Sequence, residues 1–156
     1  MFSEDILVRI QDWQSYLAKQ KNYSPKTLES YQTDLKYFLK FLEDHFNEQV
    51  NLNTLEALEV RDFRSWLAER MRGEYSQTSN ARAISSVRSF YKYLEKQKLF
   101  KNAAISAIKV SSKNRKLPKA LSLEQVMGVI DDIECEDWVD LRDKAIFKLL
   151  YGAGLR

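Results

Sequence analysis

One arginine at the end of the sequence has the clearest potential for chemistry. An apolar run leads into Gly152-Ala153-Gly154-Leu155-Arg156. Glycine adopts left-handed backbone angles at low cost and is favoured just after a helix, so these glycines predict a helix end and then a turn that carries Arg156. A guanidinium on such a turn could clamp a phosphate through two parallel hydrogen bonds and stabilise negative charge on its oxygens. The alternative is an exposed residue without a chemical role.

A stripe of small hydroxyls and bases is the second candidate. If residues 76–98 form a helix with 100° between residues, six side chains lie within about 40° of one direction. They are Thr78, Arg82, Ser85, Ser89, Lys92 and Lys96, and none is acidic. Small side chains would let a polyanion approach and the bases would attract it, so the stripe predicts contact with nucleic-acid phosphates. A solvated helix face of chance composition is the alternative.

Residues 109–119 form the most basic stretch of the chain. They contain five bases, one proline and no acid. This composition predicts a linker between two domains, and three of its bases could follow a phosphate backbone. These three are Lys113, Arg115 and Lys116. An ordinary solvated linker is the alternative.

Other reactive groups are few. His45 is the only histidine and lies near the end of a predicted helix, where we expect a structural role. Cys135 is the only cysteine and lies in an acidic stretch, which disfavours the thiolate that a nucleophile needs. The acids of residues 131–140 match no loop pattern of calcium or magnesium ligands. We therefore expect no metal, no cofactor and no catalysis by this chain alone.

The composition indicates a folded chain with a small excess of positive charge. Its 156 residues are 44% hydrophobic and 30% charged, and the formal net charge is +3. This length accommodates one domain, or a small domain with part of another. The single cysteine favours a reducing compartment, and the sequence has neither a bilayer-spanning apolar run nor the basic start of a signal peptide. A cytoplasmic location is therefore expected.

Apolar residues recur at spacings of three and four, which predicts an all-α fold. Helices are expected over residues 3–20, 24–46, 60–72 and 76–98, with a short turn over 54–58 and a short helical piece over 99–107. Ser24 and Pro25 are typical of an N-cap and a first helical position, so they predict where the second helix begins. In the helix over 60–72 the inward residues should be Phe63, Trp66, Leu67 and Met71.

A second set of helices is expected after the basic linker. Ser122 and Gln125 have the spacing of a capping box and predict a helix that continues to about Ile133. A final helix is expected over 138–151, with Leu141, Ala145, Ile146, Leu149 and Leu150 as its inward residues. The predicted organisation is a helical domain over 1–108, a linker over 109–119 and the start of another domain over 120–156.

Several segments, in order along the chain, resemble one family of proteins. They are Ser24-Pro25-Lys26-Thr27-Leu28 with Asp34-Leu35, Arg82 to Tyr91, Leu117 to Ser122, and Leu141 to Ala145 with Leu149 to Arg156. Together they resemble the N-terminal part of bacterial tyrosine recombinases of the Xer type, in the phage-integrase family. One departure is Asn102-Ala103-Ala104, where the family usually has Asn-Pro.

The resemblance implies a core-binding, SAM-like bundle of four to five helices, which forms half of a C-shaped clamp on duplex DNA. A linker and the first helices of a catalytic domain would follow, truncated at Arg156, the counterpart of the first catalytic arginine. In the family a tyrosine attacks the scissile phosphate and forms a 3′-phosphotyrosine link without a metal or an energy cofactor. The nucleophile and the other catalytic residues would lie beyond the end of this sequence.

The predicted DNA contacts combine the stripe, the second helix and the linker. They are Lys26, Thr27, Ser30, Thr78, Arg82, Ser85, Arg88, Lys92, Lys113, Arg115 and Lys116. The implied partners are a duplex recombination site and, for the full-length parent, a tetramer with itself or with a paired recombinase of the type that resolves chromosome dimers. Two alternatives remain open: a helical module that binds protein, and a short regulator that occupies DNA without cutting it.

Overall fold

The computed structural model describes residues 2–108 and 121–154. The chain divides into two compact units, residues 1–114 and 115–156, and each is described here by itself. All regular elements among the described residues are helices, as the all-α prediction requires. None of the helices within these ranges is long and apolar enough to cross a membrane.

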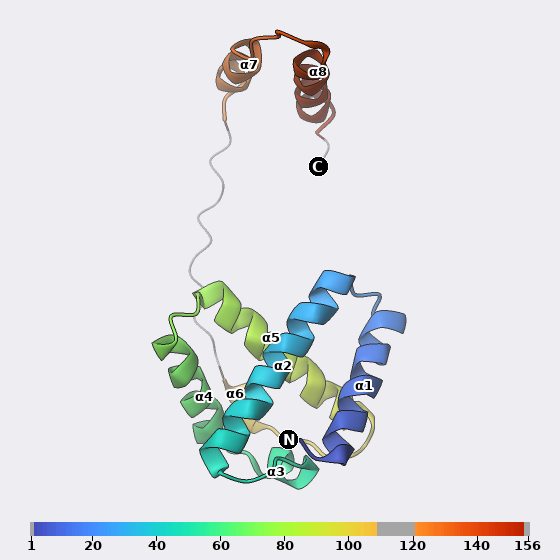
Figure 1. The fold of residues 1–156 in the computed structure, drawn as a ribbon, viewed down its shortest axis with the longest axis vertical. Coiled ribbons are helices and arrows are strands. Elements are labelled where there is room, and N and C mark those ends of the chain that lie inside the picture. Colours follow the sequence, from blue (N-terminus) through green and yellow to red (C-terminus); the bar gives the residue numbers. More distant parts are fainter. Residues whose placement is uncertain (1, 109–120, 155–156) are drawn as a thin grey trace. The chain divides into compact units, whose positions relative to one another are not determined.

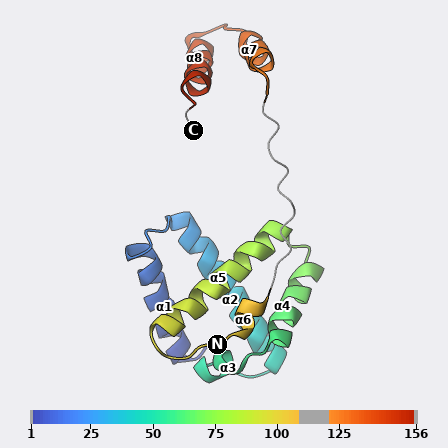
Figure 2. The same cartoon turned by 180° about the vertical axis from the view of Figure 1, so that it is seen from behind.

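The first unit is built around two long helices that cross. Figures 1 and 2 show α2 and α5 crossing at the centre, with α1 and α4 on opposite sides and α3 near the end of α2. The helices are α1 Glu4–Lys19, α2 Pro25–Phe46, α3 Leu52–Ala57, α4 Val60–Arg72, α5 Gln77–Lys96 and the short α6 Ala104–Ala107. The predicted piece over 99–107 is therefore helical only in its last turn, and most of the short turn predicted over 54–58 lies in helix α3.

Short polar segments define the ends of these helices. The hydroxyl of Ser24 accepts a hydrogen bond from the Thr27 amide at 3.3 Å, and Pro25 takes the first helical position of α2. Asn47 ends α2 in the left-handed conformation with φ 52°. The hydroxyl of Ser76 accepts from the Ser79 amide at 3.1 Å and starts α5. These caps fix where the long helices begin, and the apolar spacing decides which face of each points inward.

The core of the first unit is rich in aromatic side chains. Trp13, Phe38, Phe63 and Phe90 are fully buried, and Trp66 is 2% exposed. Trp13 contacts Phe90 edge-on at 5.5 Å between ring centroids, and Phe38 contacts Trp66 at 4.8 Å. Burial of each such side chain contributes about 1.5–3 kcal/mol, so these rings hold the four long helices together. The apolar residues of α1 that recur at spacings of three and four are all buried, namely Ile6, Ile10, Trp13 and Leu17.

One inward residue predicted for α4 is wrong. Met71 is 66% exposed, and Arg70 is buried in its place. Phe63, Trp66 and Arg70 follow one another at spacings of three and four, whereas position 71 lies about 100° further round the helix. The guanidinium of Arg70 lies 4.2 Å from the Tyr75 ring and donates to the Asn80 side-chain oxygen at 2.9 Å, which makes its burial possible.

The second unit contains α7 Leu123–Asp131 and α8 Trp138–Ala153. The predicted capping box is confirmed: the Gln125 amide donates to the Ser122 hydroxyl at 3.2 Å, and the Ser122 amide donates to the Gln125 side chain at 3.0 Å. The last helix extends past its predicted end, because Gly154, with φ 61°, is the residue in the left-handed turn. Within the described part of this unit only Ile130 is buried, so the predicted inward positions of α8 are exposed or half-exposed.

Candidate nucleic-acid interface

The solvent-facing side of α5 carries the stripe of hydroxyls and bases. Thr78, Ser85, Lys92 and Lys96 are exposed on it, and Arg82 is half-exposed. Ser89 is half-buried and accepts a hydrogen bond from the Trp13 indole at 3.2 Å. The Lys96 ammonium lies 4.4 Å from the Tyr16 ring. The stripe therefore offers exposed cations and small hydroxyls on one continuous helix face.

A polar cavity of about 390 Å³ opens beside this stripe. It lies where the end of α1, the turn into α2 and the outer side of α5 meet. Its lining residues are Tyr16, Leu17, Lys21, Tyr23, Tyr31, Ser85, Arg88, Ser89, Lys92 and Tyr93. Three of these side chains are cationic and none of the described lining residues is acidic, so the cavity suits an anion.

Two tyrosines of the cavity, Tyr31 and Tyr93, have phenol pKa values raised above the ordinary value. Burial raises the pKa of the Tyr31 phenol, and the nearby Tyr23 and Asp34 raise it further. Burial also raises the pKa of Tyr93, with a further contribution from Asp12 that Arg9 opposes. A neutral phenol keeps its proton and can donate a hydrogen bond to a phosphate oxygen. The cavity therefore combines cations with neutral donors.

Arg82 joins α5 to α2. Its Nε donates to Asp34 Oδ2 at 2.7 Å and its Nη2 to Asp34 Oδ1 at 3.3 Å. This hydrogen bond and the charge of Asp34 raise the pKa of Arg82, against a smaller opposing effect of burial. The Asp34 carboxylate is 3% exposed, so the pair lies at the edge of the core. Arg82 is thus a partly structural residue whose outer side still faces solvent.

Arg88 binds the segment around α6. It lies about 120° round the helix from Arg82. Its Nε donates to the Ile105 carbonyl at 3.3 Å, and its Nη2 donates to the Ile108 carbonyl. These bonds attach the segment around α6 to α5. Arg88 also lines the cavity, where its charge adds to that of Lys21 and Lys92.

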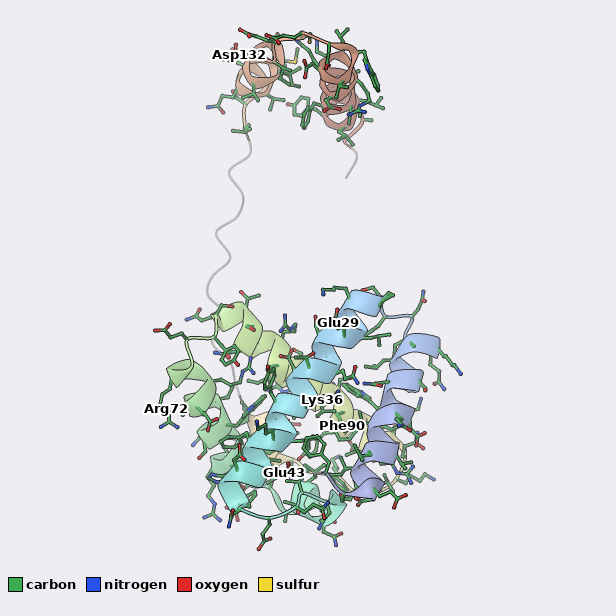
Figure 3. All side chains as sticks on the ribbon, in the orientation of Figure 1. Glu29, Lys36, Glu43, Arg72, Phe90 and Asp132 are labelled. Carbon is green, nitrogen blue, oxygen red and sulfur yellow. The ribbon has the colours of Figure 1, made fainter. Side chains whose placement is uncertain are left out.

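The predicted residues at the start of α2 lie outside the cavity lining. The Lys26 ammonium is 84% exposed and donates to the Glu29 carboxylate at 2.7 Å. The Thr27 hydroxyl lies 2.9 Å from the Ser24 hydroxyl within the cap, and Ser30 is half-buried. Figure 3 shows Glu29, Lys36 and Glu43 in succession along α2, so the outer face of α2 alternates in charge, unlike the stripe on α5.

Of the predicted contacts, the structure brings Ser85, Arg88 and Lys92 together around one cavity and leaves Lys26 and Thr27 outside its lining. Lys113, Arg115, Lys116 and Arg156 lie outside the described residues. Sequence reasoning missed Lys21 and Tyr23 as lining residues. The basic run at residues 19–22 was the signal for Lys21, and the turn at Asn22, with φ 52°, brings both residues to the cavity.

The other reactive groups form no site among the described residues. No group of three or more histidines, cysteines or acids in this part of the chain could hold a metal ion. The His45 ring stacks on Phe41 at 5.2 Å between centroids, which fits the structural role predicted for it. Cys135 is an exposed free thiol.

Sequence comparison identifies the family to which this helical fold belongs. Residues 10–98 match the phage integrase N-terminal SAM-like domain family, and this match covers more than half of the chain. The chain therefore belongs to that family, and the predicted resemblance is confirmed.

Two relatives show the particular proteins that the chain resembles. It is 44% identical to the tyrosine recombinase XerC of Rickettsia prowazekii (strain Madrid E) over 150 residues, which cover 94% of this chain and 49% of that protein. It is 41% identical to the tyrosine recombinase XerC of Rickettsia bellii (strain OSU 85-389) over 159 residues, which cover 100% of this chain and 52% of that protein. The chain thus spans about half the length of these curated relatives.

Proposed function

We propose that this chain is the DNA-binding portion of a site-specific tyrosine recombinase. The observation that carries the proposal is the cavity on the α5 face, which is lined by three cations and by no described acid. A phosphate of duplex DNA fits this chemistry, because Lys21 and Lys92 supply charge while serine and tyrosine hydroxyls donate hydrogen bonds. The family membership and the recombinase relatives support the same assignment.

The stripe on α5 would lie along the duplex, with the cavity holding a backbone phosphate. Lysine contacts of this kind release condensed counterions, so affinity should fall linearly on a plot of log K against log salt. Such contacts fix the position of the protein on DNA and leave the choice of sequence to other side chains. The predicted contacts Lys26, Thr27, Ser30 and Thr78 would extend the same surface, and Lys113, Arg115 and Lys116 remain candidates for following the backbone.

For the full-length parent we propose DNA cleavage and rejoining through a 3′-phosphotyrosine, with Arg156 as the first catalytic arginine. Its substrate would be a duplex recombination site, bound by a tetramer of one recombinase or of a recombinase pair that resolves chromosome dimers. With chromosomal DNA as its substrate, the protein would act in the cytoplasm. The tyrosine recombinases among its relatives support the recombinase assignment, and the tetramer rests on the family resemblance alone.

The test is DNA binding by the whole chain, measured by fluorescence anisotropy over a range of salt concentrations on a duplex that the chain selects from a random pool. The variant Lys21→Ala with Lys92→Ala should bind about tenfold or more weakly and should lower the log–log salt slope by about two. Both lysines are exposed at the cavity, so their removal should leave the fold intact.

The matched control is Lys40→Ala. Lys40 is also an exposed lysine of a long helix, but it lines a different groove, together with Phe2 and Leu7. Lys40→Ala should change the affinity and the log–log salt slope only by the small amount expected from the loss of one positive charge far from the bound DNA. An affinity of the unmodified chain that is independent of salt would contradict the proposed function and favour a protein-binding module instead.

A further inference from the structure

Arg82 has one edge of its guanidinium occupied and the other edge open. The Nε and Nη2 atoms form two bonds to Asp34, at 2.7 Å and 3.3 Å. A guanidinium has five N–H donors in one plane, so three donors on Nη1 and Nη2 remain. No other hydrogen bond of Arg82 occurs within the part of the chain that the structure describes. Since 46% of the Arg82 side chain is exposed and 3% of Asp34 is, the open edge faces solvent.

The carboxylate that holds Arg82 is itself held. Asp34 Oδ1 lies 4.0 Å from Nη2 of Arg70, a side chain that is 5% exposed. Arg70 is fixed by its bond to Asn80 and by the Tyr75 ring over it. Its Nη2 is buried without a hydrogen-bond partner among the described residues, so the charge of Asp34 is the nearest compensation for it. Asp34 therefore lies between two arginines, in a position that the core determines.

A held arginine binds a ligand at a lower entropic cost than a free one. A mobile arginine loses rotamer freedom worth about 1–2 kcal/mol when it is fixed. In Arg82 much of this freedom is already lost in the folded protein, because two bonds to Asp34 fix the plane of the guanidinium. Its open edge is therefore presented in one orientation before any partner arrives.

The neighbouring carboxylate also decides which acceptor suits this edge. Asp34 offsets the positive charge of Arg82 at close range, so attraction to a phosphate is weaker than at Lys92 or Lys21, which have no carboxylate in the cavity lining. The two parallel N–H groups are unaffected. They match the N7 and O6 acceptors that guanine presents in the major groove.

The surroundings of Arg82 on α5 allow such an approach. Thr78 and Ser85 lie one turn before and one turn after it, and both are small and exposed. Arg82 is in the first half of α5, whereas the cationic cavity lies beside the second half. A helix placed with its first turns against base edges and its later turns against the backbone is a common arrangement in DNA recognition.

We propose that Arg82, held by Asp34, is a specificity-determining residue that binds the N7 and O6 atoms of one guanine in the major groove of the bound duplex. This inference rests on the proposed function. It adds that the cavity and Arg82 have different tasks: the cavity binds the backbone of any duplex, and Arg82 selects among sequences.

The experiment uses the whole chain, a pool of random duplexes and a single chemical change in the DNA. The unmodified chain should select duplexes with guanine at one position of the site. Replacement of that guanine by 7-deazaguanine, which lacks the N7 acceptor, should weaken binding about 5- to 100-fold. In Arg82→Lys, which keeps the charge but has no planar fork, the same replacement should change binding less than twofold. The log–log salt slope should stay the same in this variant.

A second variant keeps the proposal open to refutation if Arg82→Lys folds poorly. In Arg82→Gln the preference at that position should shift from guanine to adenine, because a glutamine amide pairs with adenine N6 and N7. The control Lys92→Ala should lower the salt slope by about one and keep the guanine preference. Thermal unfolding of each variant checks that the fold is retained.

The outcomes separate this inference from the proposed function. An unchanged guanine preference in Arg82→Lys would overturn the role of Arg82. A lower salt slope in Arg82→Gln with the guanine preference intact would show a phosphate contact and would overturn it too. If the unmodified chain binds with steep salt dependence but selects no guanine, the DNA-binding assignment stands and the inference about Arg82 fails. Salt-independent binding by the unmodified chain would contradict the proposed function itself.

Discussion

The two units of the chain have equally regular helix ends but very different interiors. The Asp137 carboxylate caps α8 by accepting from the Val139 and Asp140 amides at 2.7 Å and 3.0 Å, as Ser76 caps α5. Yet α5 contributes a row of fully buried apolar side chains, while α8 has no buried residue. Caps depend on neighbours in the sequence, whereas burial depends on helices that come from elsewhere in the chain.

Tryptophans make the contrast plain. Trp13 and Trp66 of the first unit are 0% and 2% exposed, and Trp138 of the second is 69% exposed. Between α7 and α8 a groove of about 610 Å³ is lined almost entirely by apolar side chains, among them Ile133, Phe147 and Leu150. An apolar stripe on a helix therefore predicts a face that can pack, but it does not predict which other segment covers that face.

Hydrogen exchange should show the largest difference between the units. Amides of α2 and α5 should exchange at least about a thousandfold more slowly than amides of α7 and α8, because the former open only when a complete core unfolds. Exchange of the whole chain followed by mass spectrometry at peptide resolution measures this. Equal protection of α5 and α8 would show that α8 also opens only when a complete core unfolds.

Paired tryptophan substitutions should differ by several kcal/mol. Trp66→Ala removes a ring that packs on Phe38 at 4.8 Å and should lower the free energy of unfolding of the first unit by about 3–5 kcal/mol. Trp138→Ala removes an exposed ring and should change stability by less than about 0.5 kcal/mol. Urea unfolding followed by circular dichroism compares the two variants, and similar losses would show that Trp138 has a packing partner.

A pair of arginine substitutions should give a smaller difference. Arg88→Met removes the donors to the Ile105 and Ile108 carbonyls and should cost about 1.5–3 kcal/mol, because these bonds involve a charged donor. Arg142→Met is the matched control in the second unit, where Arg142 is half-exposed and bonds to the adjacent Asp143. It should cost less than about 1 kcal/mol in the same urea experiment. A loss at Arg88 no larger than at Arg142 would show that the hydrogen bonds of Arg88 add little to the attachment of α6.

Local signals predicted most of the fold. Ser24 with Pro25, Ser76, and Ser122 with Gln125 mark true helix starts, and the apolar spacing in α1 and α5 gives the buried faces. The error at Met71 has a physical cause: the inward position belongs to Arg70, whose burial a ring and an amide on neighbouring segments compensate. Such compensation is tertiary and leaves no trace in helical periodicity.

Only some residues of the candidate site could be predicted from the sequence. The stripe on α5 follows from the helix period, so Ser85 and Lys92 could be predicted. The partner of Arg82 could not, because Asp34 lies 48 residues away on another helix. Lys21 and Tyr23 join the cavity only because a turn at Asn22 brings them there. Sequence reasoning thus found the charged face and missed which of its arginines are already engaged.

Acid should lower the stability of the first unit slightly through Asp5, a residue of that unit alone. Burial of the Asp5 carboxyl raises its pKa, but hydrogen bonds from Ser3 and from the Leu52 and Ile6 amides outweigh this and leave the pKa below its ordinary value of 3.8. The folded chain binds this proton less readily than the unfolded chain. The contribution of Asp5 to the free energy of unfolding is therefore complete above pH 3.8, and it is lost as the pH falls through the lower pKa of the folded chain.

The variant Asp5→Asn isolates this contribution. At neutral pH it should be slightly less stable than the unmodified chain, because the charged acceptor between α1 and the start of α3 is gone. The gap between the two proteins should narrow as the pH falls below 3.8, where both carry a neutral side chain. Urea midpoints measured across this range test the sign. A gap that widens in acid would mean that the interactions of Asp5 favour its protonated form. At each pH the variant and the unmodified chain should show equal exchange in α7, since the contacts of Asp5 lie wholly within the first unit.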